Sequence, residues 1–254
     1  MRRLVAIGGL AALGLMTGPL PTLASDKNSS PPPFQCNGTY SGKTIQSNVE
    51  VPAGGVCVLL NSTVNGNIVA DTNAYLESAG SNLQGDVTGN GALTLYLHNA
   101  TRVAGNVVGY ITPQVLVYDS SVMDNVAGYN SVAPGYGHFQ VCGNKVGQSI
   151  GVAKMGPDVL IGDPAAGCGA NTLQMGSIGV AQNNTYAELY VIGNQLQTGG
   201  VYVSQNVGTS DKLVQQNSGP NGNLDCQGNA LPFTGSPNGA FKSYGDKSGP
   251  GQCH

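Results

Sequence analysis

One seven-residue phrase recurs along the chain: Ser62-Thr63-Val64-Asn65-Gly66-Asn67-Ile68 returns as Ser81-Asn82-Leu83-Gln84-Gly85-Asp86-Val87 and again as Thr101-Arg102-Val103-Ala104-Gly105-Asn106-Val107. These copies are 19 and 20 residues apart. Weaker copies extend the series to nine, from residues 43–49 to residues 217–224, with a spacing that increases along the chain. Self-similarity at such a period is typical of a solenoid, in which each unit packs against its neighbours.

Each unit also contains a second apolar alternation, such as Leu93-Thr94-Leu95-Tyr96-Leu97. Strict alternation is typical of a strand with one buried face, and Gly- and Asn-rich turns separate these segments. A single short unit cannot bury its apolar side chains, whereas stacked coils can, because each coil hydrogen-bonds to the next at roughly 4.8 Å. The sequence therefore predicts an all-β fold, a single right-handed parallel β-helix of about nine coils over residues 36–230.

Asparagine recurs at one point of the later coils, at Asn144, Asn171, Asn194 and Asn217. We expect these side chains to stack as an amide ladder. Because Asn tolerates the left-handed backbone conformation better than most residues, we also expect these four residues to form the corners themselves.

The N-terminus has the features of a secretory signal peptide: two arginines, an apolar run over residues 4–20, and small residues before Ala24. We predict a signal peptide over residues 1–24, a disordered lead-in over 25–35 and an irregular C-terminal cap over 231–254. The run is interrupted by glycines, and no later segment is long and apolar enough to span a bilayer. Removing residues 1–24 leaves 8 Lys and Arg against 13 Asp and Glu, a net charge of −5. We expect a mildly acidic protein that is secreted or located at the cell surface.

Six cysteines follow the signal peptide, and an even number in an exported chain indicates disulfide bonds. Cys36 and Cys57 lie about one coil apart, which predicts a bond between them. Stacking would bring Cys142 and Cys168 together, because each precedes a ladder asparagine closely. Cys226 and Cys253 remain, and their bond would tie the C-terminal cap to the last coil.

The coil phrase Val-x-Gly-Asn-Val, together with the ending Asn223-Leu224-Asp225-Cys226-Gln227-Gly228-Asn229, resembles a group of exported bacterial β-helix repeat proteins common in actinobacteria, which are largely uncharacterised. The resemblance covers most of the chain after the signal peptide. It implies the fold and export, and it implies no catalytic residue.

Charged residues make up only 9% of the chain, which argues against a nucleic-acid-binding protein, since such proteins need a basic face. Ser149 lies in a Gly-x-Ser-x-Gly sequence, but no helix can follow it, and it occupies the repeat position of Asn67 and Asn106. The three histidines have no metal-ligand spacing, so we expect neither a metal site nor a cofactor. A polysaccharide-cleaving enzyme on the same scaffold would need paired carboxylates. Asp86, Asp119 and Asp124 are the weak candidates for that role.

Tyrosines are the best candidates for binding. Tyr75, Tyr96 and Tyr118 fall in the second strand of successive coils, with His98 beside them. If the neighbouring leucines and valines point inward, these rings point outward and could stack on sugar rings. The alternative is that Tyr is present only because it is favoured in strands.

Three functions remain open at this point. We expect foremost a non-enzymatic rod with a structural or binding role, whose outer face contacts a polysaccharide or another surface protein. A polysaccharide lyase or glycoside hydrolase is the second, and a filament subunit that polymerises end to end is the third. Disulfides at both ends argue against polymerisation, because they would close the open edges of the solenoid.

Overall fold

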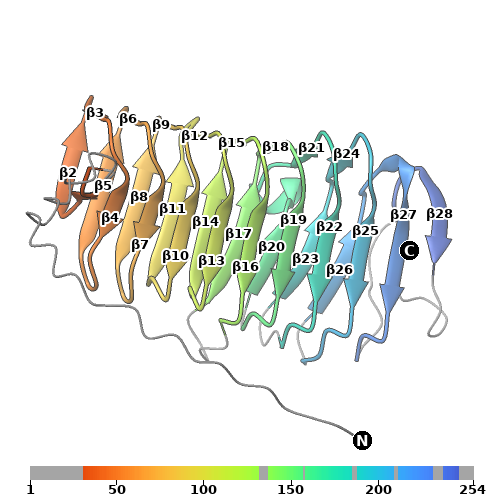
Figure 1. Ribbon diagram of the computed structural model, residues 1–254. Coiled ribbons are helices and arrows are strands. Elements are labelled where there is room, and N and C mark those ends of the chain that lie inside the picture. Colours follow the sequence, from red (N-terminus) through yellow and green to blue (C-terminus); the bar gives the residue numbers. More distant parts are fainter. Residues whose placement is uncertain are drawn as a thin grey trace, which may run out of the picture. The chain divides into compact units, whose positions relative to one another are not determined.

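The chain folds into a parallel β-solenoid of about nine turns, as predicted from the repeat (Figure 1). The computed structural model describes residues 31–131, 137–156, 158–184, 188–208, 211–230 and 237–245. Each complete turn contributes one strand to each of three sheets, sheet A continues beyond the other two at the C-terminal end, and every pairing within the sheets is parallel. In the described part, no helix is long and apolar enough to cross a membrane.

The largest sheet, sheet A, has 11 strands. They are β1 (Phe34–Gln35), β4 (Val49–Val51), β7 (Ile68–Ala70), β10 (Val87–Asn90), β13 (Val107–Tyr110), β16 (Val126–Tyr129), β19 (Ile150–Ala153), β22 (Ile178–Ala181), β25 (Val201–Ser204), β27 (Gly219–Gln227) and β28 (Phe241–Gly245).

Sheet B has nine strands, which contain the second alternation of each unit. They are β2 (Gly38–Ser41), β5 (Val56–Leu60), β8 (Tyr75–Ala79), β11 (Thr94–His98), β14 (Gln114–Tyr118), β17 (His138–Cys142), β20 (Asp158–Ile161), β23 (Glu188–Ile192) and β26 (Asp211–Gln215).

Sheet C has eight two-residue strands, formed in the quoted copies by the second and third residues of the recurring phrase. They are β3 (Thr44–Ile45), β6 (Thr63–Val64), β9 (Asn82–Leu83), β12 (Arg102–Val103), β15 (Ser121–Val122), β18 (Lys145–Val146), β21 (Thr172–Leu173) and β24 (Gln195–Leu196). Among the described residues, one 3-10 helix, η1 (Pro164–Ala166), lies in the loop before β21.

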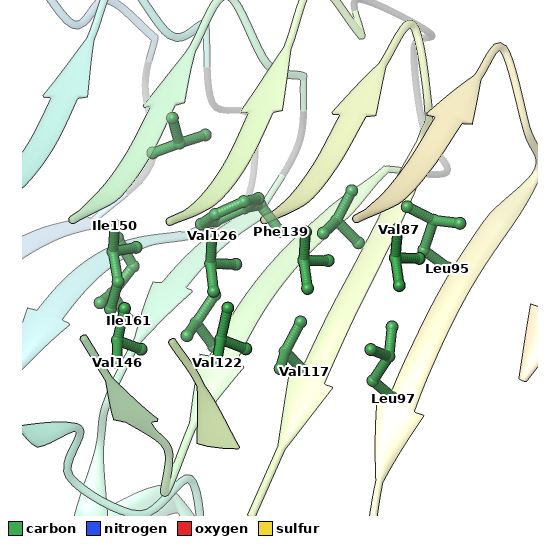
Figure 2. Close-up of a cluster of buried hydrophobic side chains, with 14 of the residues drawn as sticks. Val87, Leu95, Leu97, Val117, Val122, Val126, Phe139, Val146, Ile150 and Ile161 are labelled. Atoms are coloured by element: carbon green, nitrogen blue, oxygen red, sulfur yellow. The ribbon is translucent and has the colours of Figure 1, made fainter. Parts of the chain in front are cut away.

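The core is a set of apolar columns that run along the solenoid. Figure 2 shows part of it: Val122 and Val146 from sheet C, Val126 and Ile150 from sheet A, and Phe139 from sheet B point into one interior. All five side chains are buried. Alternate residues of a strand point to the same face, and the parallel register places the inward-facing residues of successive coils one above another.

The expected asparagine ladder is present and buried. The Nδ2 of Asn144 donates to the Oδ1 of Asn171 at 3.1 Å, and the same bond joins Asn171 to Asn194 and Asn194 to Asn217, each at 2.9 Å. Asn238 continues the ladder by accepting from Asn217 at 3.1 Å.

The backbone expectation for these asparagines was wrong. None of them has a positive φ; the residue before three of them does, with φ of 72° at Gly143, 72° at Gly193 and 56° at Gln216. The corner is thus turned by the preceding residue, which leaves the asparagine free to point its amide inward along the stack.

A second ladder, not predicted, runs along the corner between sheets A and B. The Nδ2 of Asn183 donates to the Oδ1 of Asn206 at 2.9 Å, and that of Asn206 to the Oδ1 of Asn229 at 3.0 Å. The residues before these asparagines again have positive φ, between 55° and 61°. A left-handed residue followed by a buried Asn is therefore the corner motif of the second ladder and of three of the four predicted asparagines of the first.

The disulfide predictions are confirmed for two pairs. Cys36 bonds to Cys57, with Cα atoms 5.3 Å apart, and Cys142 bonds to Cys168. Cys226 is also disulfide-bonded, while Cys253 lies outside the described residues.

The first and last strands lie beyond the limits expected from the repeat. β1 begins at Phe34, within the expected lead-in, because its backbone pairs with β4 and its ring packs edge-on against Tyr40 at 5.1 Å. β28 lies within the expected irregular cap and pairs with β27. The predicted signal peptide and residues 246–254 lie outside the described residues.

The last strand of sheet B, β26, carries a buried charge in its core-facing position. Lys212 is in register with the core residue Leu189 and is 2% exposed. Its Nζ donates to the backbone oxygen of Gly208 at 3.1 Å, and burial lowers the pKa of its ammonium group. An inward charge on an edge strand is a device that discourages further strands from adding.

Candidate functional site

The predicted binding tyrosines lie on the outer face of sheet B. Leu95, Leu97, Val115 and Val117 are fully buried, so the residues between them point outward, as expected. The parallel register of β8, β11 and β14 then brings the outward residues of three coils side by side.

Three aromatic rings form one cluster on this face. The rings of Tyr96 and His98 stack with centroids 4.1 Å apart and planes at 9°. The ring of Tyr118 meets Tyr96 edge-on at 5.9 Å. We call these three residues, with Tyr75 and Glu77, the aromatic cluster.

Glu77, which the sequence did not single out, links two of the predicted residues. Its Oε1 lies 3.1 Å from the Nε2 of His98, and its Oε2 accepts a hydrogen bond from the Tyr75 hydroxyl at 2.9 Å. Burial, followed by the hydrogen bond to Glu77, raises the pKa of Tyr75 to about 12. Burial and the nearby Tyr96 raise the pKa of Tyr118, whose hydroxyl donates to the Oε1 of Gln140. The cluster is therefore held in one arrangement by its own contacts.

The outer face of sheet B continues toward the C-terminus with a second histidine–carboxylate pair. The Nδ1 of His138 on β17 lies 2.7 Å from the Oδ2 of Asp158 on β20, and Glu188 on β23 follows in register. Both described histidines thus lie on this face, each beside an acid from a neighbouring strand.

The three weak catalytic candidates are not brought together. Asp86 lies at the turn from β9 to β10, where its Oδ1 accepts from the backbone N–H and the Nδ2 of Asn106 at 2.7 and 2.9 Å. Asp124 lies at the same corner two coils later, roughly 10 Å along the solenoid, and accepts from Gln148. Asp119 lies at a different corner, directly after β14, with φ of 44°. In the described ranges, no group of three His, Cys, Asp or Glu residues is placed to hold a metal ion.

The serine of the Gly-x-Ser-x-Gly sequence has a structural role. Ser149 stands in the corner column of Asn106 and Asn125, its N–H donates to Asn125 Oδ1 at 3.0 Å, and its Oγ accepts from the N–H of Ser177 at 3.1 Å. These hydrogen bonds account for the serine at this position, and no role as a nucleophile is needed to explain it.

A groove that the sequence did not predict lies at the corner between sheets A and B. It has a volume of about 600 Å³, and Leu93, Tyr110 and Ile111 are its exposed apolar side chains. Tyr110 and its neighbour Tyr129 stack at 5.7 Å. The signal that could have located it is the pair of tyrosines at matching points of adjacent coils.

Comparisons with protein-family models, with curated proteins and with solved structures found no match at the significance required. The function is therefore argued from the fold and from these surfaces.

Proposed function

We propose that this protein is an exported, non-enzymatic β-solenoid that binds an extracellular or cell-wall polysaccharide through the outer face of sheet B. The observation that carries the proposal is the aromatic cluster, in which Tyr96, His98 and Tyr118 from adjacent strands pack against one another at the surface.

The chemistry of the cluster suits a sugar ring. A pyranose ring has an apolar C–H face and a rim of hydroxyls, and tyrosine offers apolar ring surface beside a polar tip. The carboxylate of Glu77 and the amide of Gln140 lie at the border of the rings, where they could accept from and donate to hydroxyls. Because the side chains are already fixed by their mutual contacts, binding would cost little of their rotamer entropy.

The remaining surface supports binding over cleavage. Asp86 and Asp124 already accept hydrogen bonds from Asn106 and Gln148, and they lie two coils apart rather than as a close pair of carboxylates. The inward Lys212 on the last strand of sheet B disfavours the filament alternative. Export is supported by the N-terminal sequence and by the disulfides, since such bonds persist in oxidising compartments.

Affinity electrophoresis in gels containing uncharged glucan, mannan or xylan tests the proposal. The protein is secreted from a bacterial host with its disulfides intact, and reducing-end release is measured in parallel. We expect retardation by at least one polymer without release, and an affinity about tenfold lower for Tyr96→Ala, equivalent to about 1.4 kcal/mol.

The matched control is Tyr202→Ala, which removes a tyrosine that is 40% exposed on sheet A, away from the cluster. Release of new chain ends would show an enzyme instead. No retardation by any polymer, or equal retardation of both variants, would refute binding at the cluster.

A further inference from the structure

The groove between sheets A and B carries an unusual concentration of exposed apolar side chains. Ile111 is 65% exposed, Leu93 49% and Tyr110 46%, and they line one groove of about 600 Å³. That volume is in the range of small-ligand sites. Contiguous exposed apolar surface on an otherwise polar protein marks an interaction site more often than a structural accident.

Ile111 has a backbone conformation that is costly for its residue type. Its φ is 52°, in the left-handed region, where β-branched residues are genuine outliers. The backbone hydrogen bonds align it with six other left-handed residues of the same corner: Gly91, Asn130, Lys154, Gln182, Gln205 and Gly228. None of those is β-branched. Because the Ile111 side chain contributes nothing to the core, its strain points to a role at the surface.

The polar groups of the groove are uncharged amides. Asn73, Asn90 and Asn130 are all exposed and line it, and no Asp, Glu, Lys, Arg or His does so among the described residues. Primary amides donate to and accept from hydroxyls, while Tyr110, stacked on Tyr129, offers a ring face. This combination fits an uncharged, hydroxyl-rich ligand.

The groove and the aromatic cluster lie in the same coils. Leu93 in the groove directly precedes β11, and Tyr96 of the cluster is three residues further along that strand, roughly 10 Å away. A polymer lying along β11 would therefore reach both sites.

The charges on the outer face of sheet B disfavour an anionic polymer. On the outward positions of sheet B, the described residues include no Lys or Arg, whereas Glu77, Asp158 and Glu188 are acidic. Carboxylates along this face repel a polyanion and leave an uncharged chain unaffected.

We propose that the groove is a second subsite of the same binding surface, which takes an uncharged sugar unit of a polysaccharide lying across the solenoid axis, along β11. This inference rests on the proposed function of the aromatic cluster and extends it to a ligand class and a direction.

The test uses glucan, mannan and xylan, each uncharged and as its carboxymethylated, anionic form, in affinity gels at low salt. Two variants probe the groove: Tyr110→Ala, and Ile111→Asn, which the left-handed backbone tolerates better than isoleucine. Because Ile111→Asn relieves strain, its melting temperature is expected to be no lower than that of the parent, so lost binding cannot be ascribed to unfolding. Tyr202→Ala is the control.

We expect each groove variant to lower the affinity for the uncharged polymer about five- to tenfold, and carboxymethylation to lower it at least as much. Unchanged affinity in both groove variants, with a loss in Tyr96→Ala, would overturn the groove subsite and leave the proposed function standing. Equal retardation by the anionic forms would overturn the uncharged ligand class. A parent protein that none of the polymers retards would refute the proposed function itself, and the groove subsite with it.

Discussion

Replacing Asn194 by alanine removes the centre of the buried ladder between sheets B and C. The Asn194 side chain accepts from the N–H and the Nδ2 of Asn171 at 3.2 and 2.9 Å. It donates to the backbone oxygens of Ile161 and Ile192 and to the Oδ1 of Asn217, at 2.8, 3.2 and 2.9 Å. Alanine makes none of these bonds, and Asn194 is fully buried, so water cannot replace them.

The magnitude follows from the groups left without partners. The backbone N–H and one amide hydrogen of Asn171 and the oxygen of Ile161 lose the bonds that Asn194 makes to them, at about 1–1.5 kcal/mol for each buried group. The free energy of unfolding should therefore fall by about 3–4.5 kcal/mol.

The measurement is denaturation by guanidinium chloride followed by circular dichroism, with disulfides intact. The control is Asn82→Ala, which removes an exposed asparagine on β9 and should change the free energy by no more than about 0.5 kcal/mol. A loss below about 1 kcal/mol for Asn194→Ala would refute the reasoning, since the ladder would then be a by-product of coil stacking.

Three further predictions concern single residues. Ser78 is fully buried in a core column and its hydroxyl has no hydrogen-bond partner, so Ser78→Ala should raise the free energy of unfolding by about 1 kcal/mol in the same assay, whereas a loss would reveal a partner. The pKa of Tyr75 is raised from 10.0 to about 12, so its neutral hydroxyl contributes to the free energy of unfolding fully below pH 10, and this contribution is lost as the pH rises to 12. Ultraviolet titration should show a late tyrosine ionisation that disappears in Tyr75→Phe. Asp86→Asn should leave the free energy of unfolding within about 0.5 kcal/mol of the parent, because Asn67 and Asn106 hold the same position in adjacent coils. Asp86→Ala, which removes the acceptor, should lower it by about 1–2 kcal/mol. The same variants in the reducing-end assay would reveal any catalytic role of Asp86.

The repeat period predicted the coils because it reflects stacking itself. Val64, Leu83 and Val103 recur at one period because each must lie above the last in the core, and the same constraint places Cys36 beside Cys57. Such constraints act at every turn, so they are visible in a single sequence.

The backbone of the corners could not be predicted from the asparagines alone. A corner turned at the asparagine and a corner turned at the residue before it have the same spacing along the chain. Only the φ values show that Gly193, and not Asn194, is the left-handed residue. The second ladder did leave a signal: Gln182-Asn183 and Gln205-Asn206 are the same dipeptide, 23 residues apart.

The candidate site was predicted in part. Tyr75, Tyr96, His98 and Tyr118 were placed together by the alternation of sheet B, but Glu77 and Gln140 were missed because their contacts depend on side-chain reach across strands. The groove was missed because Leu93 continues the alternation of Leu95 and Leu97 and was therefore expected to face the core, whereas it lies at the corner and is 49% exposed.

The amide ladder gives the solenoid a polarity. From Asn144 to Asn238, each side-chain N–H points to the oxygen of the next coil toward the C-terminus, so the amide dipoles add head to tail. Each coil within the ladder therefore presents an amide acceptor to the coil before it and an amide donor to the coil after it. A coil added by duplication or removed by deletion in evolution would be accommodated only as a whole unit and in one orientation. The length of the rod can therefore change in steps of one coil, while the direction of its amide hydrogen bonds stays the same.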